Sequence, residues 1–115
     1  MQIKRYASHY LLLPEYGFLK QCAVEMKKGR GVLCIFLLSE EMENVEWYPG
    51  IILLTEKEED RNGIIRLFQI RYNLLNEIPG AFQTKSCIER IAYLLYPFDF
   101  DRMTIIGTTE IRKLE

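Results

Sequence analysis

The fold is decided by the stretch from Gly17 to Leu38, which reads GFLKQCAVEMKKGRGVLCIFLL. The apolar residues that share one parity in its first part are Phe18, Cys22, Val24 and Met26. Such alternation is typical of a β-strand. Gly29 and Gly31 then supply the positive φ angles of a turn, and the run Val32 to Leu38 is apolar almost throughout, as in a strand buried on both faces. We predict a hairpin with its tip at residues 29–31.

Similar segments flank this hairpin. Arg5 to Leu13 is rich in Tyr, Leu and Ala and ends at a proline, which marks the end of a strand. Val45 to Tyr48 and Ile51 to Leu54 are short β-prone runs. The tail from Thr104 to Leu114 is rich in β-branched residues, and Gly107 within it indicates a bulge or bend. We expect these segments to form one small, mostly antiparallel sheet or sandwich.

The segment from Ile64 to Leu75 fits two periods. Its apolar residues lie on a helical stripe, and part of them also alternate strictly as in a strand. We interpret it as a helix because its polar residues fall largely outside the stripe and the run is longer than a usual strand. Thr55 and Glu58 have capping-box spacing, whereas Asn62 and Gly63 favour a hairpin turn instead.

A second helix is predicted from Cys87 to Tyr96. Its apolar residues at positions i, i+3, i+4 and i+7 are Ile88, Ile91, Ala92 and Leu95. Ser86 and Glu89 have capping-box spacing, and Pro97 would end the helix. The fold class is therefore α+β: a sheet or small sandwich from Arg5 to Leu54 plus Thr104 to Leu114, with two helices packed on it.

Length and charge restrict the function. The 115 residues are 49% hydrophobic, which predicts one domain, residues 1–115, and they are far too few for a (β/α)₈ barrel. Fifteen basic residues stand against sixteen acidic ones, and no apolar run is long enough to span a bilayer. We expect no nucleic-acid partner, no membrane partner and no signal peptide. A spatial cluster of basic side chains would revive nucleic-acid binding: Lys4, Arg5, Arg66, Arg71 and Arg90.

Cysteine and histidine usage argues against a metal site. Cys22, Cys34 and Cys87 are odd in number and widely separated, and His9 is the only histidine. No pair has zinc-knuckle spacing, so we expect no metal and no cofactor. Buried, reduced thiols and a cytoplasmic setting fit this pattern best.

Two short charged motifs have ordinary interpretations. The basic glycine turn at residues 27–31 could cradle a phosphate, but it lacks the spacing and the following helix of a Walker loop, so a solvated hairpin tip is favoured. The acidic cluster at residues 39–44 could hold a catalytic carboxylate pair, but nothing in the sequence buries one of them. We therefore expect no catalytic residue in either motif.

The densest aromatic segments supply the candidate site. Acidic neighbours of these aromatic residues would repel phosphate groups. We therefore expect most of the aromatic side chains to pack in the core and the others to lie at a protein interface. Asp99 and Asp101 flank Phe100 and could share a cation, although a turn is the favoured interpretation. The candidate interface or pocket residues are Trp47, Tyr48, Tyr96, Phe98, Asp99 and Asp101.

Several segments of the first half carry a family resemblance. They are Arg5 to Tyr10, Gly17 to Lys20, Val24-Glu25 before the basic turn, Ile35 to Leu38 with Glu40-Glu41, and Glu46 to Ile51. Their order resembles the N-terminal β-domain of amidohydrolases of the cytosine deaminase and chlorohydrolase kind. The likeness covers residues 1–54, and Thr104 to Leu114 resembles the strand that returns to complete the same small sheet.

The departures from that family determine the expected function. After Leu54 the chain continues with TEKE, where the family has metal-binding histidines that lead into a barrel. No catalytic residue is therefore carried over, and the resemblance implies a β-domain without its barrel, whose exposed face the two helices or another subunit must cover. We expect a non-catalytic domain that acts through protein contacts as a homodimer. The alternative is small-molecule binding or a residual metal-dependent hydrolase function near Trp47, Asp99 and Asp101.

Overall fold

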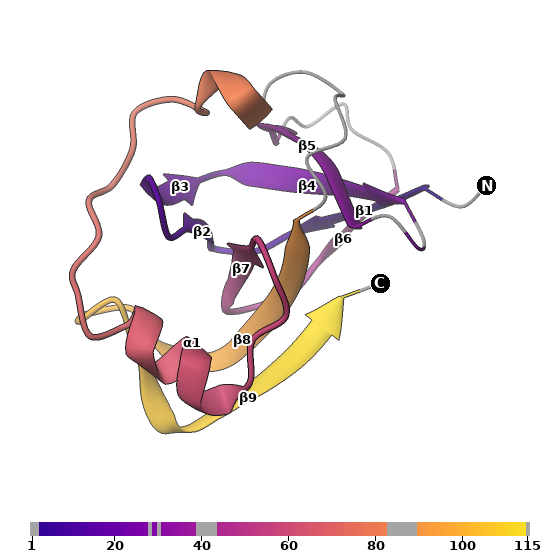
Figure 1. Cartoon of the computed structure of the whole chain (residues 1–115). Coiled ribbons are helices and arrows are strands. Elements are labelled where there is room, and N and C mark those ends of the chain that lie inside the picture. Colours follow the sequence, from indigo (N-terminus) through magenta and orange to yellow (C-terminus); the bar gives the residue numbers. More distant parts are fainter. Residues whose placement is uncertain (1–2, 28, 30, 39–43, 83–89, 115) are drawn as a thin grey trace.

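The structure, a computed structural model, describes residues 3–27, 29, 31–38, 44–82 and 90–114. Two mixed β-sheets make up most of it (Figure 1). The first sheet has the order β5-β4-β1-β6, with bounds β5 (Gly31–Leu37), β4 (Cys22–Lys27), β1 (Ile3–Ala7) and β6 (Val45–Trp47). The second has the order β3-β2-β7-β8-β9, with bounds β3 (Gly17–Lys20), β2 (Tyr10–Leu13), β7 (Ile51–Thr55), β8 (Ile91–Asp99) and β9 (Thr104–Leu114).

Three pairs of consecutive strands pass from one sheet into the other. β1 leads into β2, β3 into β4, and β6 into β7, and each pair bends where it changes sheet. Gln21, at one bend, has a φ of +52°, and Gly50, at another, has a φ of +112°. The predicted single strand from Arg5 to Leu13 is therefore two strands, because the chain must turn at residues 8–9 for the sheets to pack face to face.

Two apolar cores lie on opposite faces of the second sheet. The first core fills the space between the sheets and includes Leu11, Ile52 and Leu94. The second core includes Leu53 and Leu95, and α1 (Arg61–Leu67) packs against it. All of β7 is buried, which explains its unbroken apolar run.

The helix predicted from Ile64 to Leu75 is only partly correct. α1 ends at Leu67, and beyond it the backbone runs along the edge of β3, where Phe18 N–H donates to Asn73 O at 2.9 Å and Leu75 N–H donates to Phe18 O at 2.8 Å. The predicted cap at Thr55 and the predicted hairpin at Asn62 and Gly63 are both wrong. Asp60 is the N-cap, and its carboxylate accepts the Gly63 N–H at 2.7 Å.

The helix predicted from Cys87 to Tyr96 is wrong where the structure describes it, because residues 91–99 form β8. Ala92 and Leu94 enter the first core, while Tyr93 and Leu95 enter the second. A strand that is buried on both faces has no polar face, so its apolar run also satisfies helical spacing. Pro97 lies inside β8 at a shift of register. Cys87 and the predicted cap at Ser86 and Glu89 lie outside the described residues.

The predictions for the central hairpin and the tail are largely confirmed. β4 and β5 pair antiparallel, with φ of +85° at Gly29 and +76° at Gly31. β9 spans the predicted tail strand, and Gly107 lies where its pairing with β8 shifts register. β5 is an edge strand that is buried on both faces at Cys34 and Ile35, as predicted, whereas Leu37 at its end is 67% exposed. The described fold is therefore mostly β with one α-helix and a 3-10 turn, η1 (Gly80–Phe82), and the predicted α+β class with two helices is corrected.

Candidate interaction site

An aromatic corner forms where the strands change sheet. It consists of Trp47 at the end of β6, His9 between β1 and β2, and Phe100 just after β8. The His9 ring centroid lies 4.8 Å from that of Trp47, edge to face, and 4.7 Å from that of Phe100. Trp47 is nevertheless 51% exposed, so the corner presents a large aromatic side chain whose ring is supported from behind.

The bend between β6 and β7 orients His9. The backbone N–H of Gly50 donates to His9 Nδ1 at 3.2 Å, which fixes the imidazole ring. Gly50 can make this bond because it has no side chain: a Cβ at that position would lie 2.2 Å from Leu95 O. Ser8 Oγ donates to Tyr10 O at 2.8 Å and braces the neighbouring turn of the backbone. The corner is therefore set by backbone geometry before any partner binds.

The corner is continuous with the second core. Phe100 lies 6.0 Å from Tyr10 and 5.2 Å from Phe98, centroid to centroid. Phe98 is buried, and its ring also meets Phe68 at 5.8 Å. Of the predicted interface residues, Phe98 therefore belongs to the core, whereas Trp47 lies at the surface.

Asp99 and Asp101 form a turn. Asp99 Oδ1 accepts the backbone N–H groups of Asp101 at 3.0 Å and Arg102 at 3.1 Å. This confirms the turn interpretation, although the turn joins β8 to β9 and follows no helix. Within the described ranges, no group of three or more His, Cys, Asp or Glu residues is placed to hold a metal ion.

Tyr48 and Tyr96 lie apart from Asp99 and Asp101, in a tyrosine cleft of about 220 Å³. The cleft is lined by Tyr48, Pro49, Leu94, Tyr96, Glu110 and Arg112. The Arg112 guanidinium carbon lies 4.9 Å from the Tyr48 ring centroid, and Tyr48 Oη donates to Glu46 Oε2 at 2.8 Å. Glu110 and Arg112 are not among the site residues predicted from the sequence. Alternation along the tail strand places both on one face and would have found them.

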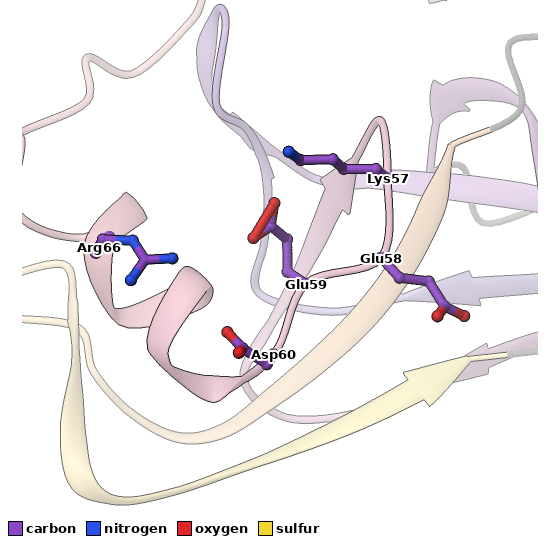
Figure 2. A pocket seen from close by; sticks show the side chains of 5 residues that line it. All are labelled: Lys57, Glu58, Glu59, Asp60 and Arg66. Carbon is purple, nitrogen blue, oxygen red and sulfur yellow. The ribbon is translucent and has the colours of Figure 1, made fainter.

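A charged hollow lies beside the start of α1 (Figure 2). Its volume is about 480 Å³, and its lining residues are Lys57, Glu58, Glu59, Asp60 and Arg66. Glu58 points away from the other four (Figure 2) and pairs with Lys113, which lowers the pKa of the Glu58 carboxyl by a hydrogen bond and by charge. Asp60 is already the helix cap. Two of the three carboxylates that line the hollow, those of Glu58 and Asp60, thus have structural roles.

Three of the five basic residues named as a possible cluster, Arg5, Arg66 and Arg90, lie in different places. Arg5 lies in the first sheet and pairs with buried Glu25 at 3.2 Å, while Arg66 lies on α1, beyond the second sheet. Arg90 is nearly buried and stacks on Phe82, with its guanidinium carbon 5.3 Å from the ring centroid.

Arg90 joins two acidic residues. Its Nη2 hydrogen-bonds Glu56 Oε1 at 3.3 Å. Its Nη1 approaches Glu15 Oε2 at 2.6 Å without hydrogen-bond geometry, so this contact is electrostatic. These arrangements place Arg5, Arg66 and Arg90 in separate ion-pairing or structural environments and give no support to a phosphate-binding face.

Two of the three thiols are described, those of Cys22 and Cys34, and both are buried and reduced. Burial raises the pKa of the Cys22 thiol to about 11, and its Sγ donates to Lys20 O at 3.2 Å. Cys34 Sγ donates to Glu25 Oε2 at 3.8 Å. The expectation of buried, reduced thiols is confirmed for these two, while Cys87 lies outside the described residues.

Comparison with protein-family models, curated proteins and solved structures finds no match. No helix in the described part of the chain has the length and apolar character needed to cross a bilayer.

Proposed function

We propose that this chain is a non-catalytic domain that acts through protein–protein contacts, in a homo-oligomer or with another protein. The observation that carries the proposal is the half-exposed Trp47, whose ring packs against His9, which in turn packs against Phe100. An aromatic side chain that is already oriented loses little conformational entropy on binding, which is the property of the residues that dominate protein interfaces.

The proposed origin is an amidohydrolase-like accessory domain that lacks its barrel. The resemblance implies a β-sheet face that helices or another subunit must cover. In this chain α1 and residues 68 and 72 pack on the second core, so that face of the second sheet is covered from within the chain. The need for a second subunit therefore rests on the surface features, including Trp47. The buried, reduced thiols of Cys22 and Cys34 support a reducing, cytoplasmic setting.

Co-purification from the cells that make the protein tests the role of Trp47. Tyr16 gives a matched control, because it is 45% exposed and also packs edge-on against another ring, Phe82. A protein bound stoichiometrically to the native chain should be lost with Trp47→Ala and retained with Tyr16→Ala. Identical sets of bound proteins from all three chains would contradict the proposed role of Trp47.

Small-molecule binding is the second candidate function. The tyrosine cleft is a better place for a ligand than the predicted pocket near Trp47, Asp99 and Asp101. The cleft combines two aromatic rings with Arg112 and Glu110. Its volume of about 220 Å³ is below the roughly 300–1,000 Å³ of most ligand pockets, which favours the interaction role. A thermal shift with nucleobases or related amides, lost in Tyr48→Ala, would support this candidate. No shift and no stoichiometric metal by elemental analysis would remove it together with the residual hydrolase function.

A further inference from the structure

We propose that the outer edge of β9 is a dimerisation surface, on which a second copy of this chain pairs its own β9 antiparallel about a two-fold axis at Ile111. This deepens the interaction role proposed above by naming one partner and its register. It uses a different surface from the aromatic corner.

The edges of the second sheet differ in how they are covered. At one edge, both backbone groups of Phe18 in β3 bond to the segment after α1, through Asn73 and Leu75. At the other edge, β9 pairs with β8 on its inner side, and no strand of the described residues pairs with its outer side. A long exposed edge strand is a template for pairing with another chain.

Part of this edge is already protected by α1. Arg61 Nη1 donates to Thr109 O at 2.7 Å, and Arg61 Nη2 donates to Gly107 O at 3.1 Å. These two carbonyls lie where β9 departs from regular pairing with β8. The regular part of β9, which pairs from Glu110 to Leu114 with β8, is left as the surface for a second strand.

The order of charged residues along β9 determines which register of the two paired β9 strands is favoured. Glu110 and Arg112 line the tyrosine cleft and so share one face of the sheet, while Ile111 packs on the second core at the other face. Opposite residues of an antiparallel pair have side chains on the same face, so a two-fold axis perpendicular to the sheet must pass midway between a residue and its own copy. The available centres in this segment are Glu110, Ile111, Arg112, Lys113 and Leu114.

Centres at Glu110, Arg112 or Lys113 place two like charges directly opposite each other, which destabilises a strand pair. A centre at Leu114 uses only the end of the strand. A centre at Ile111 places Glu110 opposite the second copy's Arg112, and the symmetry repeats the pair. The paired residues are then 110–112 of each copy, clear of the two carbonyls that Arg61 holds. The two isoleucines then meet on the other face. The formal net charge of -1 adds little general repulsion between copies.

Charge reversal with mixing tests the register. Glu110→Arg alone and Arg112→Glu alone each turn both opposite pairs into like pairs, and each should weaken self-association about tenfold or more. An equimolar mixture of the two variants should form a heterodimer, because every facing pair is again opposite. Arg112→Glu also loses its contact with the Tyr48 ring, but mixing does not restore that contact, so recovery reports the interface.

Cross-linking gives a second measurement that does not depend on charge. Opposite Cα atoms in an antiparallel pair lie about 4.5–5.5 Å apart, within disulfide range. In a Cys87→Ser background, Ile111→Cys should form an intermolecular disulfide on mild oxidation. Ile106→Cys, on the same strand but beyond the register shift, should not.

The outcomes separate this surface from the general interaction role. A native dimer that both charge reversals leave intact would overturn the β9 register and leave the interaction role standing. A dimer that Trp47→Ala abolishes would move the interface to the aromatic corner and also overturn the proposal. A monomeric native chain at high micromolar concentration would overturn self-pairing, while a separate partner lost with Trp47→Ala would still support the interaction role.

Discussion

Gly50 is the residue on which the aromatic corner depends. Its φ of +112° is disfavoured for residues with a side chain, and a Cβ would lie 2.2 Å from the backbone oxygen of Leu95. Gly50→Ala should therefore lower the free energy of unfolding by about 3 kcal/mol or more. It should also shift the fluorescence of Trp47, the only tryptophan, because His9 loses its bond to Gly50.

Gly29→Ala is the matched control. Gly29 also has a positive φ, +85°, but a Cβ at that position would have no heavy atom within 4 Å. Its cost should be about 1–2 kcal/mol, with Trp47 fluorescence unchanged. Chemical denaturation measures both variants, and equal losses would show that the bend at Gly50 has no special packing requirement.

Cys22 makes a prediction about reactivity and pH. Burial raises the pKa of its thiol from 9.0 to about 11, so the thiolate at pH 8 should be depleted about 100-fold in the folded state. In a Cys34→Ser, Cys87→Ser background, a thiol reagent should react slowly until denaturant is added. Because folding raises this pKa, the associated stability is complete below pH 9 and is lost as the pH rises toward 11. Equal reaction rates of folded and unfolded chains at pH 8 would contradict burial of this thiol.

The turn between β8 and β9 determines how Phe100 reaches His9. Asp99 Oδ1 accepts two backbone N–H groups of that turn, whereas no hydrogen bond of the Asp101 carboxylate enters this arrangement. Asp99→Ala should cost about 1 kcal/mol of stability, and Asp101→Ala should cost less than half of that. Thermal unfolding compares the two. A larger loss from Asp101→Ala would point to a shared role of the two carboxylates that the turn does not explain.

Elements marked by a clear local signal in the sequence were the ones that could be predicted. The β4–β5 hairpin follows from alternation and two turn glycines, and β9 follows from its β-branched residues. β8 was wrongly predicted as a helix because both of its faces are buried, which removes the polar positions that distinguish the two periods. Helix α1 is shorter than predicted because the residues after it bond to the edge of β3, a contact far away in the sequence.

The candidate site residues, too, could be predicted only in part, because their arrangement depends on contacts far apart in the sequence. Trp47 stood out as the only tryptophan, but its support by His9 depends on a bend that brings together residues 9, 47 and 100. Glu110 and Arg112 were missed because an acidic and a basic residue two positions apart are a common pattern, which gains meaning only once the strand is known to lie at an edge. Asp99 and Asp101 could be assigned to a turn from their spacing alone.

At the scale of the whole molecule, two surfaces lie at different places. The aromatic corner gathers where β6, the bend before β2 and the β8–β9 turn meet, whereas the proposed β9 surface lies in the part of β9 that pairs with residues 92–96. In a dimer through β9, Trp47 of each copy, at the end of β6, lies outside the paired strands. Two such anchors on one particle would raise the avidity for a partner that has two matching sites.

The two cores also explain the high hydrophobic content of the chain. The second sheet has an apolar core on each face, so both faces carry apolar residues. A sheet with one face in solvent would carry polar residues at those positions. The 49% hydrophobic composition is thus largely explained within one chain, and the exposed apolar residues that remain, Trp47 and Tyr96 among them, are separate features of the surface.

Sedimentation equilibrium of the native chain from low to high micromolar concentration tests whether the chain associates with itself. Self-association predicts a molar mass that rises with concentration from the 13.6 kDa of one chain toward twice that value. It also predicts that Trp47→Ala follows the same curve. A mass that stays at 13.6 kDa across the whole range would contradict association of this chain with itself.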